Sequence, residues 1–327
     1  MTLSSSESKS LSWIRVAAML SIVICHLFQA YQGRWSDVFN MGVQVFFVLS
    51  GFLYGHKLLS DWRAWAKNRI RRVYQPYLLF LIAVIPLYAF FHEEAMNWKA
   101  LPVYFLNLQG FRLLPRLGFL KIEGLRHVWF ITAIMCAYLS TPLLQRLRTF
   151  SGILMPALIL LVAAAYCLTP SFRYVFVLSW VYLYAIGYLF ANLDSRWQMF
   201  YLLLFLVALT ILAFFMKWEI FRRPWSASYR LVHDLVGVVI VVGGVKVLSL
   251  VKGLEVPLVI RFLDKYSFPV YLVHFIIMHG PFSMAYVTPF RWINIVLMLA
   301  TTSVAVFAFV FANNALERIW PRKTNNE

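Results

Sequence analysis

An arginine and a histidine lie within one long apolar stretch near the start of the chain. Residues 11–31 read LSWIRVAAMLSIVICHLFQAY and contain Arg15 and His26. In an α-helix this spacing brings the two residues to within about 20° of each other, about 16 Å apart along the axis. An imidazole exchanges a proton near neutral pH, and a guanidinium binds carboxylates or phosphates. The pair therefore indicates proton transfer on the same helix face as an anion-binding group.

The stretch that carries this pair is long enough to cross a bilayer core of about 30 Å. An ionisable side chain there costs about 2.5–3.5 kcal/mol, so such residues usually face the protein interior and serve a function. Two structural alternatives stay open. Arg15 could extend its side chain to the cytoplasmic surface, and His26 could make a hydrogen bond that serves packing only. The neighbouring Cys25 could carry an acyl group, but a buried cysteine is more often inert.

The composition indicates a polytopic membrane protein. Of the 327 residues, 62% are hydrophobic, and apolar runs of about twenty residues recur along the chain. Such runs are too long for the strands of a membrane barrel, so we predict an all-α bundle. The ten expected transmembrane helices are at residues 11–32, 38–58, 75–91, 127–147, 151–169, 173–192, 198–216, 231–251, 264–281 and 291–314.

The basic residues predict the orientation. The net charge is +17, and the Lys and Arg residues lie mainly between the apolar runs, which argues against a nucleic-acid partner. The short connection 57–72 is especially basic, so the positive-inside rule places it and both termini in the cytoplasm. We expect a disordered N-terminus (1–10), a membrane domain (11–316) and a cytoplasmic tail (317–327), in the inner (plasma) membrane. No metal site is predicted.

Two of the predicted spans carry conspicuous small or polar residues. In the span at 38–58, Gly42, Gly51 and Gly55 permit close helix approach, which is typical of a tight helix interface but is also compatible with a site. In the span at 264–281, polar residues are spaced by four and three and share one helix face; they are Ser267, Tyr271 and His274. This stripe predicts either a cavity wall or a hydrogen-bonded helix seam.

Three further parts of the sequence have residues that could serve either structure or function. Residues 92–126 are too polar to span and too long for a simple connector, so they are a candidate lid or re-entrant element. Arginines such as Arg69 and Arg72 could determine topology or bind phosphate groups. His233 and Asp234 could pair with each other where a span begins.

Five motifs together resemble the acyltransferase-3 family of integral membrane O-acyltransferases. They are the Arg15 and His26 pair, GVQVFFVLSGFL at 42–53, RVYQPY at 72–77, HVWFITAIMCAYLSTPLL at 127–144 and YSFPVYLVH at 266–274. The resemblance implies a ten-helix domain that takes an acyl group, most often acetyl from acetyl-CoA on the cytoplasmic side. It also implies transfer to a hydroxyl of a bacterial cell-surface polysaccharide or a lipid-linked glycan precursor.

The resemblance also implies roles for individual residues. Arg15 and His26 match the arginine and histidine that the family requires for activity. The other matching motif positions are Arg72, His127, Trp129, Ser267, Tyr271 and His274. The chain departs from the family at Gln44, where an acidic residue is common, and at Gln75, where proline is common. Some members carry an additional SGNH-type domain, whereas we expect a stand-alone membrane domain here.

Acyl transfer to an alcohol needs a base for the hydroxyl and a group that stabilises the oxyanion. We expect His26 to be the general base, or alternatively to form a transient acyl-imidazole. Arg15, assisted by Arg69 or Arg72, would hold the phosphate or pantetheine part of acyl-CoA, which acts as a substrate rather than a bound cofactor. The 267–274 stripe would orient His26 or donate to the oxyanion.

The outward segments 92–126 and 217–230 are themselves basic, so they are expected to receive an anionic acceptor. Arg222 and Arg223 are the candidate acceptor-binding residues. A rival function is a multi-span transporter that exports a glycan precursor or an acidic solute. It would use the intramembrane Arg15 and His26 as a substrate or proton site. The rival predicts no binding of acyl-CoA. The oligomeric state is not predicted.

Overall fold

The computed structural model describes residues 3–33, 35–111, 120–168, 178–216 and 227–319, and these residues contain helices but no strand. The chain divides into two compact units. Unit 1 consists of Met1–Ser60, Phe111–Leu113 and Cys136–Asp264, and unit 2 consists of Asp61–Gly110, Leu114–Met135 and Lys265–Glu327. The prediction of an all-α polytopic protein is confirmed.

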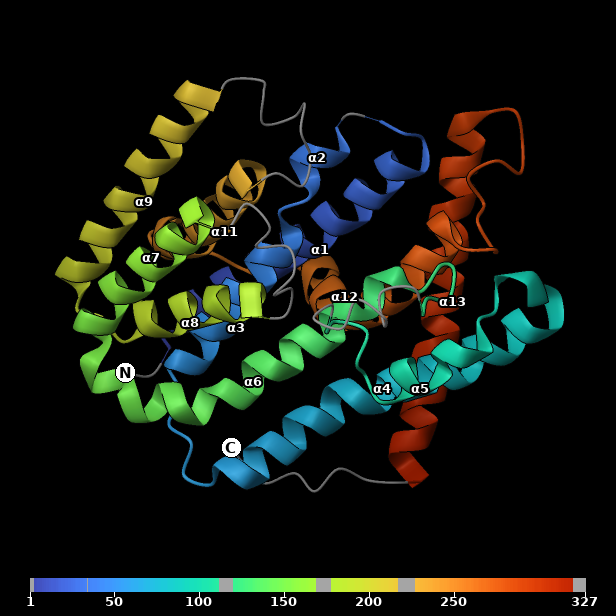
Figure 1. The fold of residues 1–327 in the computed structure, drawn as a ribbon, viewed down its shortest axis with the longest axis horizontal. Helices are drawn as coiled ribbons and strands as arrows, with labels where there is room; N and C mark the ends of the chain where they lie inside the picture. Colours follow the sequence, from blue (N-terminus) through green and yellow to red (C-terminus); the bar gives the residue numbers. More distant parts are fainter. Residues whose placement is uncertain (1–2, 34, 112–119, 169–177, 217–226, 320–327) are drawn as a thin grey trace. The chain divides into compact units, whose positions relative to one another are not determined.

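Unit 1 is centred on four helices, of which α3 and α8 lie side by side, and α1 and α11 pack against α3 (Figure 1). Its helices are α1 (Ser5–Ala30), α2 (Ser36–Phe39), α3 (Gly42–Gly55), the 3-10 turn η4 (Arg148–Phe150), α7 (Ser151–Leu168), α8 (Leu178–Ala191), α9 (Ser195–Met216) and α11 (Ala227–Ser249). This arrangement places the apolar stretch with Arg15 and His26 in the core of the unit.

Glycines bring α3 and α8 into direct backbone contact. A Cβ atom on Gly51 would lie 1.9 Å from the carbonyl oxygen of Tyr184, and one on Gly187 would lie 2.1 Å from that of Val48. No side chain fits at either position, so the two helices approach as closely as their backbones allow. The prediction of close helix approach in this span is confirmed, and the contacts are those of a tight helix interface.

Unit 2 is built around a long helix, α4, against which α13 packs. Its elements are α4 (Trp62–Phe91), η1 (Glu93–Ala95), η2 (Trp98–Ala100), α5 (Leu101–Phe105), η3 (Arg126–Val128) and α13 (Arg291–Ile319). Two further helices, α6 (Trp129–Leu147) and α12 (Leu258–His279), each contribute residues to both units.

Two helices start earlier than the sequence indicated. Residues 5–10 are helical rather than disordered, because Ser4 caps α1 by accepting from the amide of Glu7 while the Glu7 carboxylate accepts from the amide of Ser4. The connection 57–72 is largely helical as well, since Asp61 caps α4. Pro76, the second residue of the predicted span 75–91, therefore lies within α4.

Seven helical stretches of the described residues are long and apolar enough to cross a membrane. One of them, Arg126–Ala165, contains the predicted span 127–147 and most of the predicted span 151–169, and η4 separates the two. The predicted span 173–192 lies partly outside the described residues and continues as the short apolar helix α8. The predicted span at 264–281 corresponds to α12. Because of its polar residues, α12 is not among these seven apolar stretches.

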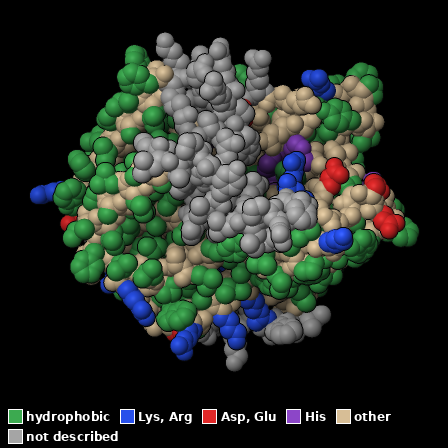
Figure 2. Space-filling model, viewed as in Figure 1, with side chains coloured by type: hydrophobic (Ala, Val, Ile, Leu, Met, Phe, Trp, Pro, Cys, Tyr) green, Lys and Arg blue, Asp and Glu red, His purple; other side chains and the backbone are tan. Residues whose placement is uncertain are grey.

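Large hydrophobic side chains are exposed on the helices that bound each unit. Phe200, Phe214 and Phe215 of α9 are more than half exposed, as are Trp292 and Phe311 of α13. Hydrophobic side chains cover much of the surface in Figure 2. Apolar surface of this extent is typical of helices that face lipid.

The described part of the polar segment 92–126 forms hydrogen bonds with the helices of unit 2. Tyr77 of α4 donates to the carbonyl of Tyr104 over 2.7 Å, and the amide of Gln109 donates to the carbonyl of Val128 over 3.0 Å. Residues 112–119 lie outside the described part. A lid or re-entrant role for the segment stays a prediction.

Candidate active site

Arg15 and His26 lie on the interior face of α1 in unit 1. Leu20, which is 42% exposed, marks the outer face, and helix geometry turns both residues about 120–140° away from it. Met19 and Ile22, which occupy the same face between them, are buried. The side chains of Arg15 and His26 are thus directed into the unit rather than toward lipid.

The ring of His26 is oriented by a neighbour on its own helix. Its Nδ1 atom lies 2.7 Å from Oε1 of Gln29, one turn further along α1. Because an amide oxygen only accepts hydrogen bonds, we assign the ring proton to Nδ1, which leaves the lone pair on Nε2. His26 is half-buried, and in this tautomer its basic nitrogen is Nε2. Gln29 is not among the residues predicted from the sequence, although its spacing of three from His26 places it one helical turn away.

Arg15 forms an ion pair with Asp264 of α12, also in unit 1. The distance from Nη1 to Oδ1 is 2.5 Å, and the two side chains are 27% and 15% exposed. Asp264 precedes Ser267 by three positions, so it lies on the same helix face as the polar stripe that the sequence showed. That spacing was the signal from which Asp264 could have been found. The pair is neutral overall. The contact with Asp264 uses one of the five N–H groups of the guanidinium.

The polar stripe of α12 meets the start of α6 within unit 2. Tyr271 donates from its hydroxyl to the carbonyl of His127, and Nε2 of His127 lies 3.0 Å from the carbonyl of Leu272. His127 stacks on Phe275 with a centroid distance of 4.8 Å, and the rings of His127 and His274 are 5.9 Å apart. These contacts are those of a hydrogen-bonded seam.

Both histidines of this seam are buried, and backbone carbonyls define their tautomers. His274 is 0% exposed, and its Nδ1 lies 2.9 Å from the carbonyl of Tyr271, so Nδ1 carries the proton. In His127 the proton is on Nε2, which faces the carbonyl of Leu272. The lone pairs are therefore on Nε2 of His274 and on Nδ1 of His127.

A family model described as an acyltransferase domain, Acyl_transf_3, matches residues 8–312, nearly the whole chain. The chain belongs to this acyltransferase family. A search of curated proteins and a search of solved structures gave no match. The protein is therefore a membrane acyltransferase, in agreement with the resemblance seen in its motifs.

The remaining candidate site residues that the structure describes are in unit 2. Arg69 and Arg72 lie on α4 one turn apart, with Arg69 half-buried and Arg72 exposed. Trp129 is half-buried at the first position of α6, and Ser267 is 7% exposed on α12. The predicted acceptor-binding residues, Arg222 and Arg223, lie outside the described residues.

The acyltransferase also contains a buried polar network in unit 1 that the sequence analysis misread. His233 and Asp234 do not pair with each other. Asp234, which is 2% exposed, accepts from Nε of Arg230 over 2.8 Å and from the hydroxyl of Tyr182. The ring of His233 instead contacts the carbonyls of Tyr229 and Asp37, at 2.8 and 2.6 Å. Adjacent helical residues point about 100° apart, so they reach different partners.

Among the described residues, no group of three or more His, Cys, Asp or Glu side chains is placed to hold a metal ion. Cys25, beside His26, is 1% exposed and belongs to the packed interior of unit 1, as expected for an inert cysteine.

Proposed function

We propose that this acyltransferase is an O-acetyltransferase of the inner (plasma) membrane that takes acetyl from acetyl-CoA. Its acceptor would be a hydroxyl of a bacterial cell-surface polysaccharide or a lipid-linked glycan precursor. The observation that carries the proposal is the inward-facing imidazole of His26, whose Nδ1 lies 2.7 Å from Oε1 of Gln29. Family membership supports acyl transfer, and the motif resemblance supports the choice of donor and acceptor.

In this mechanism, Nε2 of His26 removes the proton of the acceptor hydroxyl as its oxygen attacks the thioester carbonyl. A tetrahedral intermediate forms and then collapses with cleavage of the C–S bond. The leaving thiolate takes the proton from the imidazolium, so the products are an acetyl ester and free CoA. In the alternative route, Nε2 attacks the thioester carbonyl, the C–S bond breaks, and CoA leaves as the thiolate from an acyl-imidazolium. The acceptor oxygen then attacks the acyl carbon and the N–C bond breaks, which restores the neutral imidazole, while the hydroxyl proton passes to the CoA thiolate.

Arg15 is proposed to contact the pantetheine or phosphate part of the donor, with Arg69 or Arg72 assisting. The ion pair with Asp264 limits this role, because an anion approaching Arg15 also meets a carboxylate. Tyr271 already donates its hydroxyl to the His127 carbonyl. That contact favours a positioning role for the α12 stripe over direct donation to the oxyanion.

The test uses purified protein in lipid nanodiscs with radiolabelled acetyl-CoA and a glycan fraction from the host. We expect the wild type to release CoA and label the glycan, and His26→Ala to lose at least about a hundredfold in rate, as for a general base. His92→Ala is the matched control, because His92 lies in the polar segment beside Glu94, remote from α1 in sequence. Wild-type rates in His26→Ala at normal protein levels would contradict the mechanism.

A transporter makes the opposite prediction. It would release no CoA from acetyl-CoA in nanodiscs, whichever residue is changed. Mass spectrometry of surface glycans from cells with and without the gene identifies the acceptor, since one acetyl mass should be lost from a single sugar. An unchanged glycan profile together with CoA release would leave acyl transfer intact but contradict a surface-glycan acceptor.

A further inference from the structure

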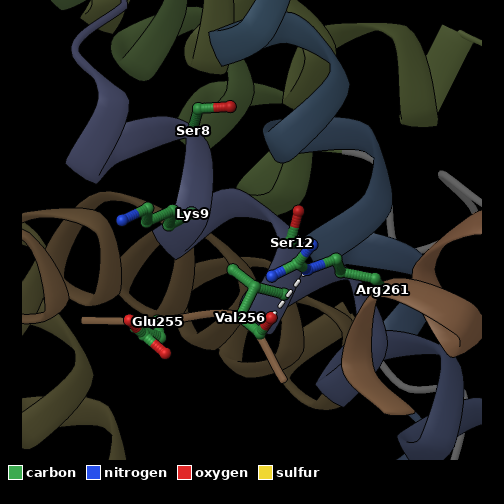
Figure 3. A pocket seen from close by; sticks show the side chains of 6 residues that line it. All are labelled: Ser8, Lys9, Ser12, Glu255, Val256 and Arg261. Atoms are coloured by element: carbon green, nitrogen blue, oxygen red, sulfur yellow. Dashed lines mark hydrogen bonds between the residues drawn. The ribbon is translucent and has the colours of Figure 1, made fainter. Parts of the chain in front are cut away.

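A pocket of about 320 Å³ opens at the N-terminal end of α1, within unit 1. Figure 3 shows the side chains that line it: Ser8, Lys9, Ser12, Glu255, Val256 and Arg261. The first three come from α1 and the others from the start of α12 and the residues before it. None of these residues belongs to the five motifs or has a role in the proposed mechanism.

Two hydrogen bonds hold the walls of this pocket together. The indole N–H of Trp13 donates to the carbonyl of Glu255 over 3.2 Å, which ties α1 to the segment before α12. Nε of Arg261 donates to the carbonyl of Val256 over 2.8 Å, the bond drawn in Figure 3. The second bond fixes one edge of the guanidinium and leaves its terminal nitrogens for a ligand.

The charges of the pocket favour an anion. Lys9 and Arg261 supply two positive charges against the single carboxylate of Glu255. In the described part of the chain, neither cation forms an ion pair with a carboxylate, whereas Arg15 is already paired with Asp264. The charged groups of Lys and Arg and the hydroxyl of Ser all donate hydrogen bonds to phosphate oxygens. The pocket therefore has two positive charges that are not in ion pairs among the described residues, whereas the positive charge of Arg15 is neutralised by Asp264.

The pocket also lies on the catalytic face of α1. Ser8, Ser12 and Arg15 are spaced by four and three, and His26 completes the same stripe. From Ser12 to His26 the helix rises about 21 Å, and from Arg15 about 16 Å. An acyl-CoA molecule has the matching layout, because an extended pantetheine arm separates its phosphates from its thioester.

The size of the pocket is also consistent with one end of such a donor. Binding sites for small molecules usually measure about 300–1,000 Å³, so this pocket is near the lower limit. It can take a nucleotide phosphate group but not a whole acyl-CoA. We propose that the pocket binds the phosphorylated nucleotide end of acyl-CoA, with the pantetheine arm running along α1 toward His26. This inference rests on the proposed function.

The experiment measures binding of radiolabelled CoA and of 3′-dephospho-CoA to the full-length protein in phosphatidylcholine nanodiscs, with no acceptor needed. We expect Lys9→Ala to weaken CoA binding about fivefold, Lys9→Glu to weaken it further, and Lys9→Arg to retain it. Lys252→Ala is the matched control, because Lys252 is exposed and lies outside the pocket. Equal affinities of all the Lys9 variants would overturn the proposal.

Glu255 supplies a test of opposite sign. Removing its charge with Glu255→Gln leaves the backbone carbonyl that Trp13 binds and makes the pocket more positive, so CoA should bind about twofold to threefold more tightly. A merely structural role would not produce a gain. If Glu255→Gln weakens CoA binding while the protein keeps its thermal stability, the pocket does not hold the phosphates.

The same chemistry would suit the phosphate of a lipid headgroup, so a second arm uses nanodiscs that contain phosphatidylglycerol. If Lys9→Ala changes the response to phosphatidylglycerol but leaves CoA binding unchanged, a lipid occupies the pocket and the proposal is wrong. If the pocket binds CoA but the proposed function fails, the outcome is different: Lys9→Ala would still weaken CoA binding, but the wild-type protein would release no CoA from acetyl-CoA in the transfer assay.

Discussion

Nη1 of Arg15 lies 2.5 Å from Oδ1 of Asp264, and the two residues are 249 positions apart in the chain. The ion pair joins the middle of α1 to the second turn of α12 within unit 1. A guanidinium and a carboxylate that are largely removed from water must be paired, because either charge alone would be costly. The residue predicted to bind the donor is thus also one that holds two helices together.

These two roles of Arg15 can be separated by exchanging the charges. Asp264→Ala should lower the free energy of unfolding by about 1–3 kcal/mol, less than for a fully buried pair because both side chains are partly exposed. The double variant Arg15→Asp with Asp264→Arg should recover part of this loss. If Arg15 contacts the donor, the double variant should remain inactive; thermal unfolding and acetyl transfer measure the two effects. Full activity in the double variant would remove Arg15 from donor binding.

Gln29 is predicted to act on catalysis through the tautomer of His26. Gln29→Leu removes the acceptor at Nδ1, so we expect kcat to fall about tenfold with little change in KM for acetyl-CoA. Gln29→Glu restores an acceptor and should recover the rate, in a transfer assay at fixed acceptor. An equal fall in both variants would show that Gln29 serves packing instead.

Gly51 and Gly152 form a matched pair for testing the contact between α3 and α8. Gly51→Ala would place a Cβ atom 1.9 Å from the Tyr184 carbonyl, so the helices must separate, and we expect a loss of several kcal/mol and poor accumulation in membranes. Gly152→Ala, at a helical position of α7 with nothing within 4 Å, should be neutral or stabilising by up to about 1 kcal/mol. Thermal unfolding in detergent measures both.

Tyr271 tests whether the α12 stripe is a seam or a catalytic wall. Tyr271→Phe keeps the ring and loses only the hydrogen bond to the His127 carbonyl, so the seam predicts a stability loss of about 1 kcal/mol and nearly unchanged kcat. Tyr286→Phe is the control, because Tyr286 is 72% exposed. A fall in kcat of a hundredfold at unchanged stability would favour an oxyanion role instead.

Part of the structure followed directly from local sequence patterns. The long apolar runs predicted membrane helices, because lipid leaves the backbone no other hydrogen-bonding partners. The spacing of Arg15 and His26 predicted that both share a helix face, and Gly51 predicted close approach. Helix starts were less well predicted at Ser5 and Trp62, since capping by Ser4 and Asp61 outweighed the polar character of the first turns.

Partners distant in the chain were decided by tertiary structure alone. The sequence placed His233 beside Asp234 but could not show that Asp234 accepts from Tyr182 while His233 reaches Asp37. Nor could it assign Asp264 to Arg15. Helical periodicity is a local property that a single chain displays, whereas ion pairs and hydrogen bonds between helices depend on which faces meet when the helices pack.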